Sequence, residues 1–178
     1  DNNLSAEATG TGGTVDIDGT GTYSQSTGSH IYVYGGRGGT IDMNTTGNLG
    51  LLGTNYLYAY ATNATQLGGV IRLTSGGTLN MASSNARIYT YGQSDATNNL
   101  IELTGNTLAT NGQLYANNVG GGVGGKINLT TTGSMAVNGA LRARGDSAIG
   151  GAGGAITLQS NTGAIALNSA TIEAQGYV

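Results

Sequence analysis

The chain contains no cysteine, proline, tryptophan or phenylalanine. Without cysteine it can form neither a disulfide bond nor a thiolate metal site. The lack of proline suits a chain whose backbone N–H groups are nearly all needed in hydrogen-bonded ladders. Charged residues are also scarce, at 8% of the chain, and the formal net charge is −3. This balance predicts that neither nucleic acid nor an anionic membrane surface is a partner.

Long apolar runs are missing as well. No run approaches the ~18 residues that a membrane-spanning helix needs, so no membrane insertion is expected. The single histidine, His30, excludes His-based triads and His-rich metal sites, and we interpret it as an ordinary turn residue near the start of a strand. No cofactor is predicted. Glycine, by contrast, makes up 34 of the 178 residues, but a regular apolar alternation argues against disorder.

A short phrase recurs along the chain, in which a glycine precedes two apolar residues separated by one position. The first member of each apolar pair lies 26 to 30 residues after the previous one. Self-similarity at such a period indicates a solenoid. The six pairs are Val15/Ile17, Ile41/Met43, Ile71/Leu73, Ile101/Leu103, Ile127/Leu129 and Ile156/Leu158.

Each period contains two further strand-like phrases with the same spacing of two, the period of a strand that buries one face. No stretch has helical periodicity. In four of the six third phrases the second inward residue is alanine, which predicts a tight corner. The second phrases are Tyr23/Gln25, Leu49/Leu51, Leu79/Met81, Leu108/Thr110, Met135/Val137 and Ile165/Leu167. The third phrases are Ile31/Val33, Leu57/Ala59, Ile88/Thr90, Leu114/Ala116, Leu141/Ala143 and Ile172/Ala174.

Three strands per period predict an all-β fold, a right-handed parallel β-helix of triangular cross-section with about six coils and no helices. Each strand would pair in parallel with its equivalent one coil on, about 4.8 Å away. We expect a single domain over residues 1–178, with coils that begin near residues 12, 38, 68, 98, 124 and 153. Residues 1–11 would form the last strand of a preceding partial coil.

The ends of the chain show neither a polar cap nor an amphipathic helix. Leu4-Ser5-Ala6 matches the third phrase, so we expect the chain to enter in the middle of a coil and to leave after a third strand. Open solenoid ends present unpaired strand edges. The sequence therefore predicts partners at the ends, which are either other copies stacked head to tail or adjoining coils of a longer solenoid.

Seven of the ten tyrosines occupy outward positions of the third phrases. Exposed aromatic patches often mark interaction sites, so these residues are a candidate platform for glycans or for a partner surface. Alternatively, the rings form a ladder that only stabilises the fold, at ~0.5–1.5 kcal/mol per stacked pair. Both interpretations can hold together. The two columns are Tyr32, Tyr58, Tyr89 and Tyr115, and Tyr34, Tyr60 and Tyr91.

The insertions between repeats gather at one corner, after the third phrase. In solenoids the side that carries the insertions is often the binding side. Glycine- and asparagine-rich loops can, however, simply relax the geometry of a turn. The four insertions are Ala61–Gly69, Gly92–Asn99, Asn117–Gly125 and Arg144–Gly153.

Asp16, Asp18 and Asp42 form the only carboxylate cluster of the pattern. Paired carboxylates on a β-helix can support polysaccharide cleavage or bind calcium. The cluster has no histidine partner and lies toward one end of the chain. It therefore predicts no catalytic residue and at most a weak calcium site. Along the same outward column, Asp42, Arg72 and Glu102 predict an ion-pair ladder across coils.

The phrase Gly-Gly-x-Ile-x-Leu-x-x-x-Gly-x-Ile-x-Leu, followed by Leu/Ile-x-Ala-x-Gly, resembles the β-helical repeats of filamentous-haemagglutinin-like exoproteins. The best copies are Gly153–Gly176 and Gly124–Gly145, and the resemblance covers residues 12–178. Those proteins are large bacterial surface adhesins exported by two-partner secretion, and autotransporter passengers have similar repeats. The resemblance implies an extracellular, cell-surface stalk or adhesin without a named receptor.

Three functions remain open from the sequence. The first is a secreted structural or adhesive protein without enzymatic activity, part of a bacterial surface fibre that assembles through the open ends. The second is a glycan-binding module that uses the tyrosine columns. The third, less favoured, is a polysaccharide-degrading enzyme that uses Asp16, Asp18 and Asp42.

Overall fold

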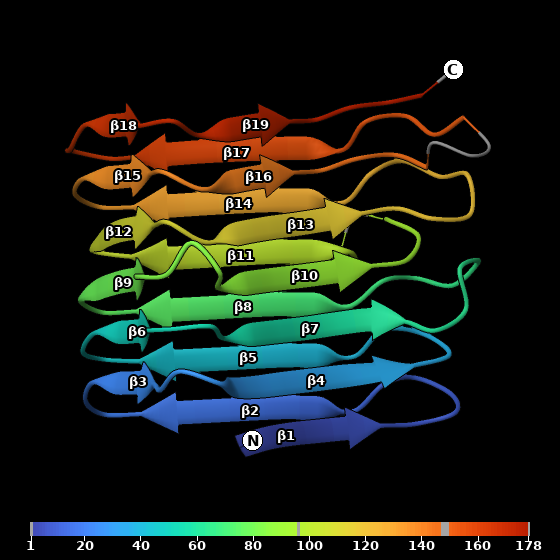
Figure 1. Cartoon of the computed structure of the whole chain (residues 1–178), viewed down its shortest axis with the longest axis horizontal. Coiled ribbons are helices and arrows are strands. Elements are labelled where there is room, and N and C mark those ends of the chain that lie inside the picture. Colours follow the sequence, from blue (N-terminus) through green and yellow to red (C-terminus); the bar gives the residue numbers. More distant parts are fainter. Residues whose placement is uncertain (1, 96, 147–149, 178) are drawn as a thin grey trace.

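The computed structural model describes residues 2–95, 97–146 and 150–177. Within these residues the chain forms nineteen β-strands that wind into a stack of coils (Figure 1). The same residues contain no helix, and therefore none that is long and apolar enough to cross a membrane. The predicted all-β solenoid is confirmed.

The coils build three parallel sheets, and each complete coil contributes one strand to each sheet. Sheet 1 consists of β2 (Thr14–Gly19), β5 (Thr40–Thr45), β8 (Val70–Ser75), β11 (Leu100–Gly105), β14 (Lys126–Thr131) and β17 (Ala155–Ser160). Sheet 2 consists of β3 (Tyr23–Gln25), β6 (Leu49–Leu51), β9 (Thr78–Met81), β12 (Thr107–Thr110), β15 (Met135–Val137) and β18 (Ile165–Leu167). Sheet 3 consists of β1 (Asn2–Glu7), β4 (Ser29–Gly35), β7 (Tyr56–Ala61), β10 (Arg87–Tyr91), β13 (Gln113–Asn117), β16 (Ala140–Arg142) and β19 (Thr171–Glu173).

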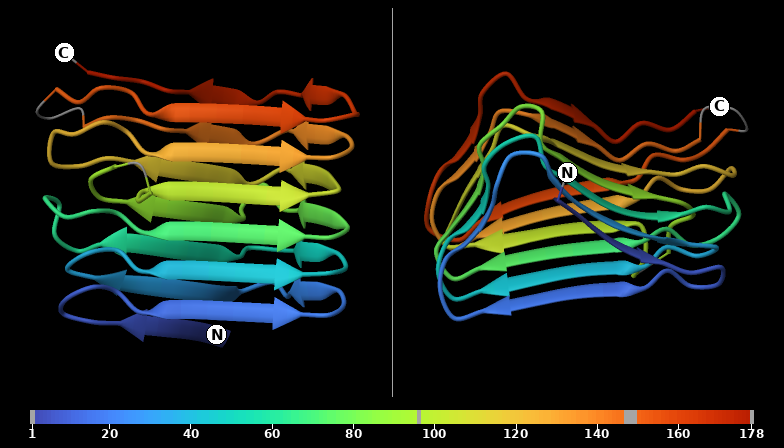
Figure 2. Two further views of the ribbon diagram at one scale, coloured as in Figure 1. Left: turned by 180° about the vertical axis from the view of Figure 1, so that it is seen from behind. Right: turned by 60° about the horizontal axis from the view of Figure 1, so that its bottom comes forward.

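Equal positions of the repeat form columns along the stack. Ile41, Ile71 and Ile101 are register partners in consecutive strands of sheet 1. The second phrase Tyr23/Gln25 contains no aliphatic residue at its inward positions, yet it forms a strand because it pairs residue for residue with Leu49–Leu51 of the next coil. Figure 2 shows the three-sided shape that results when the coils are seen from below.

The core is the interior of this three-sided tube. Alternate residues of each strand point inward, and in β7 the partly exposed and buried positions alternate along the whole strand. In the middle coils the inward columns are fully enclosed, with Leu73, Ile101 and Leu103 all 0% exposed. Each such aliphatic side chain contributes ~1.5–3 kcal/mol before the entropy of ordering the chain is subtracted.

The same inward columns are open at both ends of the tube. Leu4 in β1 is 49% exposed, and Leu167 and Ile172 in the last coil are 53% and 40% exposed. The strands of the end coils have a neighbour on one side only. The two end faces therefore present apolar side chains together with unpaired backbone groups.

Glycine fills the corner between sheet 3 and sheet 1. A Cβ atom on Gly39 or on Gly154 would lie only 2.2 or 2.0 Å from a carbonyl oxygen of the coil before it. A Cβ atom on Gly69 would lie 2.6 Å from the Cβ atom of Ala59. This contact explains the alanine of the third phrase and confirms the predicted tight corner.

One coil departs from this pattern at two positions. Asn99 occupies the glycine position, where it has a positive φ of 53° and is fully buried. Its side-chain oxygen accepts a hydrogen bond from Thr90 Oγ1 at 2.8 Å, and its amide donates to the Gly92 carbonyl oxygen at 2.9 Å. Thr90 itself stands where neighbouring coils have alanine, so the two polar residues satisfy each other inside the corner.

Candidate functional site

The outward face of sheet 3 collects most of the tyrosines. The parallel register places rings of consecutive coils directly opposite each other, as the sequence predicted. All seven tyrosines that the sequence singled out therefore lie on one face. The first column is Tyr32, Tyr58, Tyr89 and Tyr115, and the second is Tyr34, Tyr60 and Tyr91.

A third column, which sequence analysis missed, lies beside the first. His30, Tyr56 and Arg87 occupy outward positions two residues before it. The rings of His30 and Tyr56 stack with centroids 4.5 Å apart, and His30 Nδ1 accepts a hydrogen bond from the Tyr56 backbone N–H at 3.2 Å. His30 thus lies within β4, and the interpretation as a turn residue was wrong. The two-residue alternation that leads to Tyr32 also passes through His30 and could have revealed the column.

The rings of the first column form a continuous ladder. The centroids of Tyr32 and Tyr58 are 5.5 Å apart, as are those of Tyr58 and Tyr89, and the Tyr89–Tyr115 distance is 6.1 Å. These distances fall within the range of favourable aromatic pairs. The planes are inclined to each other by 57° to 79°, so the ladder presents tilted faces instead of one flat surface.

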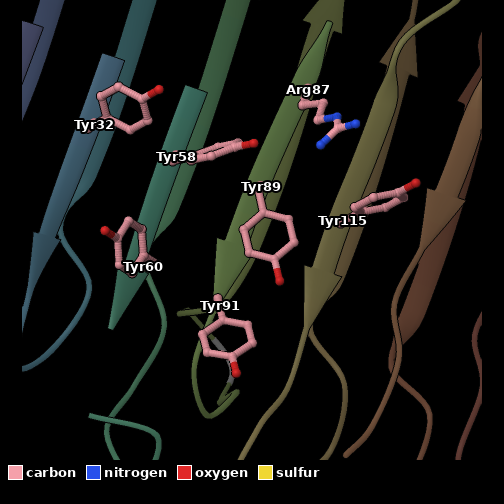
Figure 3. Close-up of a pocket in the computed structure, with 7 residues that line it drawn as sticks. All are labelled: Tyr32, Tyr58, Tyr60, Arg87, Tyr89, Tyr91 and Tyr115. Carbon is pink, nitrogen blue, oxygen red and sulfur yellow. The ribbon is translucent and has the colours of Figure 1, made fainter. Parts of the chain in front are cut away.

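In the second column, the rings of Tyr60 and Tyr91 turn away from each other. Tyr60 stacks on Tyr34 at 5.1 Å and Tyr91 stacks on Tyr89 at 5.9 Å, while no ring contact joins Tyr60 to Tyr91 in the described part of the chain. Figure 3 shows the two rings turned apart. A cavity of about 640 Å³ lies over this face, and we call it the tyrosine groove. It is lined by Tyr32, Tyr58, Tyr60, Arg87, Tyr89, Tyr91 and Tyr115.

Among the residues that the structure describes, Arg87 is the only cation that lines the groove. Its guanidinium carbon lies 5.7 Å from the centre of the Tyr56 ring. Arg142, farther along sheet 3, lies over the Tyr115 ring at 5.2 Å and forms an ion pair with Glu173 at 3.1 Å. No ion pair among residues 2–95, 97–146 and 150–177 involves Arg87. The groove therefore contains a positive charge that no carboxylate of these residues compensates.

Burial raises the pKa of five phenols of the groove. Desolvation raises the pKa of Tyr58 above the usual 10.0, although Arg87 acts in the opposite direction. Desolvation also raises the pKa of Tyr89, and the neighbouring phenols add to the effect. The hydroxyls of these two residues are therefore protonated at neutral pH and can donate hydrogen bonds. The pKa is raised for Tyr32, Tyr58, Tyr60, Tyr89 and Tyr91.

Two carboxylates lie on the side of the groove that is remote from Arg87. Burial is the main reason for the raised pKa of Tyr60 and Tyr91, and the charges of Glu7 and Asp146 add to it. Arg87 thus lies on the side of the third column. Glu7, which accepts a hydrogen bond from the Tyr34 hydroxyl, lies on the side of the second.

Asp16, Asp18 and Asp42 lie on the outward face of sheet 1, on β2 and β5. Burial raises the pKa of Asp42, and Arg72 partly offsets this effect. Within the described ranges, no group of three His, Cys, Asp or Glu side chains is placed to hold a metal ion. The geometry therefore gives the suggested calcium site no support.

The predicted ion-pair ladder on sheet 1 forms in part. Arg72 Nε lies 3.2 Å from Glu102 Oε2. Asp42 is the register partner of Arg72, but no ion pair between these two is present in the described structure. The Arg72 and Glu102 side chains are 39% and 41% exposed, so their pair contributes only ~0–1 kcal/mol.

The longer connections gather at the corner between sheets 3 and 1, as predicted (Figure 2). In one of them Asp95 accepts hydrogen bonds from the backbone N–H groups of Thr97 and Asn98, both at 2.7 Å. These bonds lower the pKa of Asp95 to about 2. Because the partners of its carboxylate belong to its own loop, Asp95 shapes the turn.

Comparison of the chain with family models, with curated proteins and with solved structures finds no match. The resemblance to filamentous-haemagglutinin-like repeats therefore stays a prediction from the repeat phrase. Two features of the molecule bear on function, the open end faces and the tyrosine groove.

Proposed function

We propose that this chain is a structural segment of an extracellular fibre on a bacterial surface, without catalytic activity. The observation that carries the proposal is the exposure of inward residues in the end coils. Leu167 is 53% exposed, whereas Val137, its register partner one coil before, is 0% exposed. An apolar column that ends in solvent has the character of an interface that another coil covers.

A further coil fits the C-terminal face directly. Its three strands would pair with β17, β18 and β19 in that order and continue all three sheets. Covering Leu167 and Ile172 would then contribute up to ~1.5–3 kcal/mol each, and the unpaired edge groups would gain partners. Growth by successive coils therefore produces a rod in which each coil stabilises its neighbours.

A second copy of the chain fits less directly. Sheet 3 has seven strands, whereas sheets 1 and 2 have six each. If β1 of a second copy paired with β19, one strand position in each of the other two sheets would stay empty. All three sheets continue only if β4 of the copy pairs with β19, which requires its β1 to leave β4. Stacking of copies thus sacrifices the β1–β4 pairing, and adjoining coils do not.

Electron microscopy of the natural material, combined with its intact mass and with immunogold labelling of intact cells, tests this function. We expect label on the cell surface and rod-shaped particles. An intact mass far above 17.7 kDa would indicate adjoining coils of one long chain, and long rods of 17.7 kDa chains would indicate stacked copies. Globular particles, or label confined to the cell interior, would contradict the proposal.

The tyrosine groove supports glycan binding as a second function. The supporting observation is a cavity of about 640 Å³ on an outward sheet face, lined by six tyrosines and one arginine. The C–H face of a sugar ring packs against an aromatic ring, and neutral phenol hydroxyls donate hydrogen bonds to sugar oxygens. A rod with such a lateral face is adhesive, so the two functions are compatible.

A double variant with Tyr58→Ser and Tyr89→Ser tests the second function. We expect it to lose binding on a glycan array while its circular dichroism remains that of a β-solenoid. Tyr177→Ser removes a tyrosine outside the groove and serves as the matched control. Unchanged binding by the double variant would remove the glycan-binding function.

A further inference from the structure

The shape of the tyrosine groove suits a chain of sugar units. Tyr58 and Tyr89 belong to neighbouring strands, and their rings are 5.5 Å apart and inclined by 57°. Tyr60 and Tyr91 rise beside them and are turned apart (Figure 3). A volume of about 640 Å³ lies within the range of small-ligand sites. Tilted aromatic faces can each pack against a different ring of an oligosaccharide, which one flat ring cannot do.

The positive charge of Arg87 sets a second requirement for a ligand of the groove. Arg87 is exposed and lies in no ion pair of the described residues. The ring of Tyr56 lies beneath its guanidinium, at 5.7 Å. A guanidinium presents a planar fork of N–H donors that matches the oxygens of a carboxylate or a sulfate. The partners of Arg87 in the chain, Tyr56 and Tyr58, are uncharged, so an acidic partner is expected to come from the ligand.

A carboxylate lies on the other side of the groove. Glu7 accepts a hydrogen bond from the hydroxyl of Tyr34, whose ring stacks on Tyr60. An acidic substituent of a ligand would thus be directed toward Arg87, and uncharged sugar hydroxyls toward Glu7.

We propose that the tyrosine groove binds a saccharide chain that carries acidic groups, with Arg87 pairing with the acid and Tyr58 and Tyr89 packing against the sugar rings. The inference rests on the proposed glycan-binding function and specifies the class of its ligand. A carboxylate and a sulfate offer the same chemistry to Arg87, and both are included.

Three polymers with one backbone test the inference: dextran, carboxymethyl dextran and dextran sulfate. The chain has ten tyrosines and no tryptophan, so its intrinsic fluorescence reports on tyrosine alone. We expect a fluorescence titration to give a dissociation constant for at least one acidic polymer that is about tenfold or more below that for dextran. Tighter binding of the carboxymethyl polymer assigns a carboxylate as the natural group, and tighter binding of the sulfated one assigns a sulfate.

Arg87→Gln removes the charge and keeps most of the side-chain length. It should weaken binding of the acidic polymer about tenfold or more and leave dextran binding unchanged. Arg37→Gln is the matched control, because Arg37 is also exposed but lies outside the groove. Equal losses in the two variants would show a nonspecific charge effect and overturn the inference.

Two further outcomes distinguish failure of the acidic-ligand proposal from failure of the proposed glycan-binding function. Equal affinity for dextran and both acidic polymers, lost in the Tyr58→Ser/Tyr89→Ser variant, would overturn the acidic ligand and keep glycan binding. No binding of any of the three polymers would overturn both. Neither result would affect the proposal of a structural fibre, which rests on the end coils.

Discussion

At the scale of single residues, the corner of the solenoid shows how one polar residue can replace a glycine. Asn99 adopts the left-handed backbone conformation that asparagine tolerates better than most residues. Its buried amide is satisfied by Thr90 and Gly92. A polar residue is thus tolerated at the glycine position because a second polar residue, at the alanine position, forms a hydrogen bond with it.

Asn99→Ala should therefore destabilise the fold by roughly 1–3 kcal/mol, because it leaves the Gly92 carbonyl without this donor and Thr90 without this acceptor. The double variant Asn99→Gly/Thr90→Ala restores the pattern of the other coils and should recover most of the loss. Urea unfolding of the single and double variants measures the coupling between the positions. Strictly additive losses would show that the two residues do not depend on each other.

Inward leucines contribute differently to stability in the middle and at the end of the tube. Leu103→Ala removes a 0% exposed side chain and should cost ~2–5 kcal/mol. Leu167→Ala removes one that is 53% exposed and should cost less than about 1 kcal/mol in the isolated chain. Denaturant unfolding compares them. Similar losses would mean that the end face is already covered in solution.

At the scale of elements, sheet 3 carries both the small inward residues of the tight corner and the tyrosine groove. Five of its phenols have a pKa raised by burial, so the folded state keeps their protons longer than the unfolded state does. Above the usual value of 10.0 the unfolded chain binds fewer protons than the folded chain. Ionisation of the tyrosines therefore favours unfolding.

The free energy of unfolding should consequently be constant below the usual phenol pKa and fall as the pH rises through the raised values of the folded state. Urea unfolding from about pH 9 to about pH 12, followed together with phenolate absorbance, measures this dependence. In a Tyr58→Phe/Tyr89→Phe variant the fall should be shallower. Stability that is unchanged while the groove tyrosines ionise would refute the account of their burial.

The sequence predicted the strands well because each inward apolar pair recurs at the same phase in every coil. Even Tyr23 and Gln25 formed a strand, since their partners in the next coil impose the ladder. The sequence also predicted which tyrosines share a column, because equal positions of successive coils are register partners. Arg87 was missed because its column contains a different type of residue in each coil, so only the two-residue alternation of the strand marks it, and no recurring residue type does.

The cavity could not be predicted from the sequence either. Spacing assigns Tyr60 and Tyr91 to one column, but it does not determine the side-chain rotamers. In the structure the two rings turn toward different neighbours, Tyr34 and Tyr89. The groove results from this choice of rotamers, which depends on packing between coils.

At the scale of the whole molecule, the solenoid is a one-dimensional stack in which each coil contacts its neighbours along the axis. The end coils therefore have a neighbouring coil on one side only. The central claim is that these end faces are surfaces for further coils. A tandem chain tests it, with a second set of coils, residues 12–178, joined directly after residue 178 so that β17, β18 and β19 acquire neighbours.

Two substitutions in the first set of the tandem chain serve as a matched pair. Ile172→Lys places a charge in the covered joint and should uncouple the two sets. Leu52→Lys changes a side chain of similar exposure, 51%, that lies outside the end faces, and it should leave the coupling intact. Together they distinguish a specific joint from a general effect of added charge.

Thermal unfolding of the tandem chain by calorimetry is the most direct measurement. If the end faces accept further coils, the tandem chain unfolds in one cooperative transition at a higher temperature than the single chain. Two sets of coils that unfold independently at the temperature of the single chain would contradict the claim.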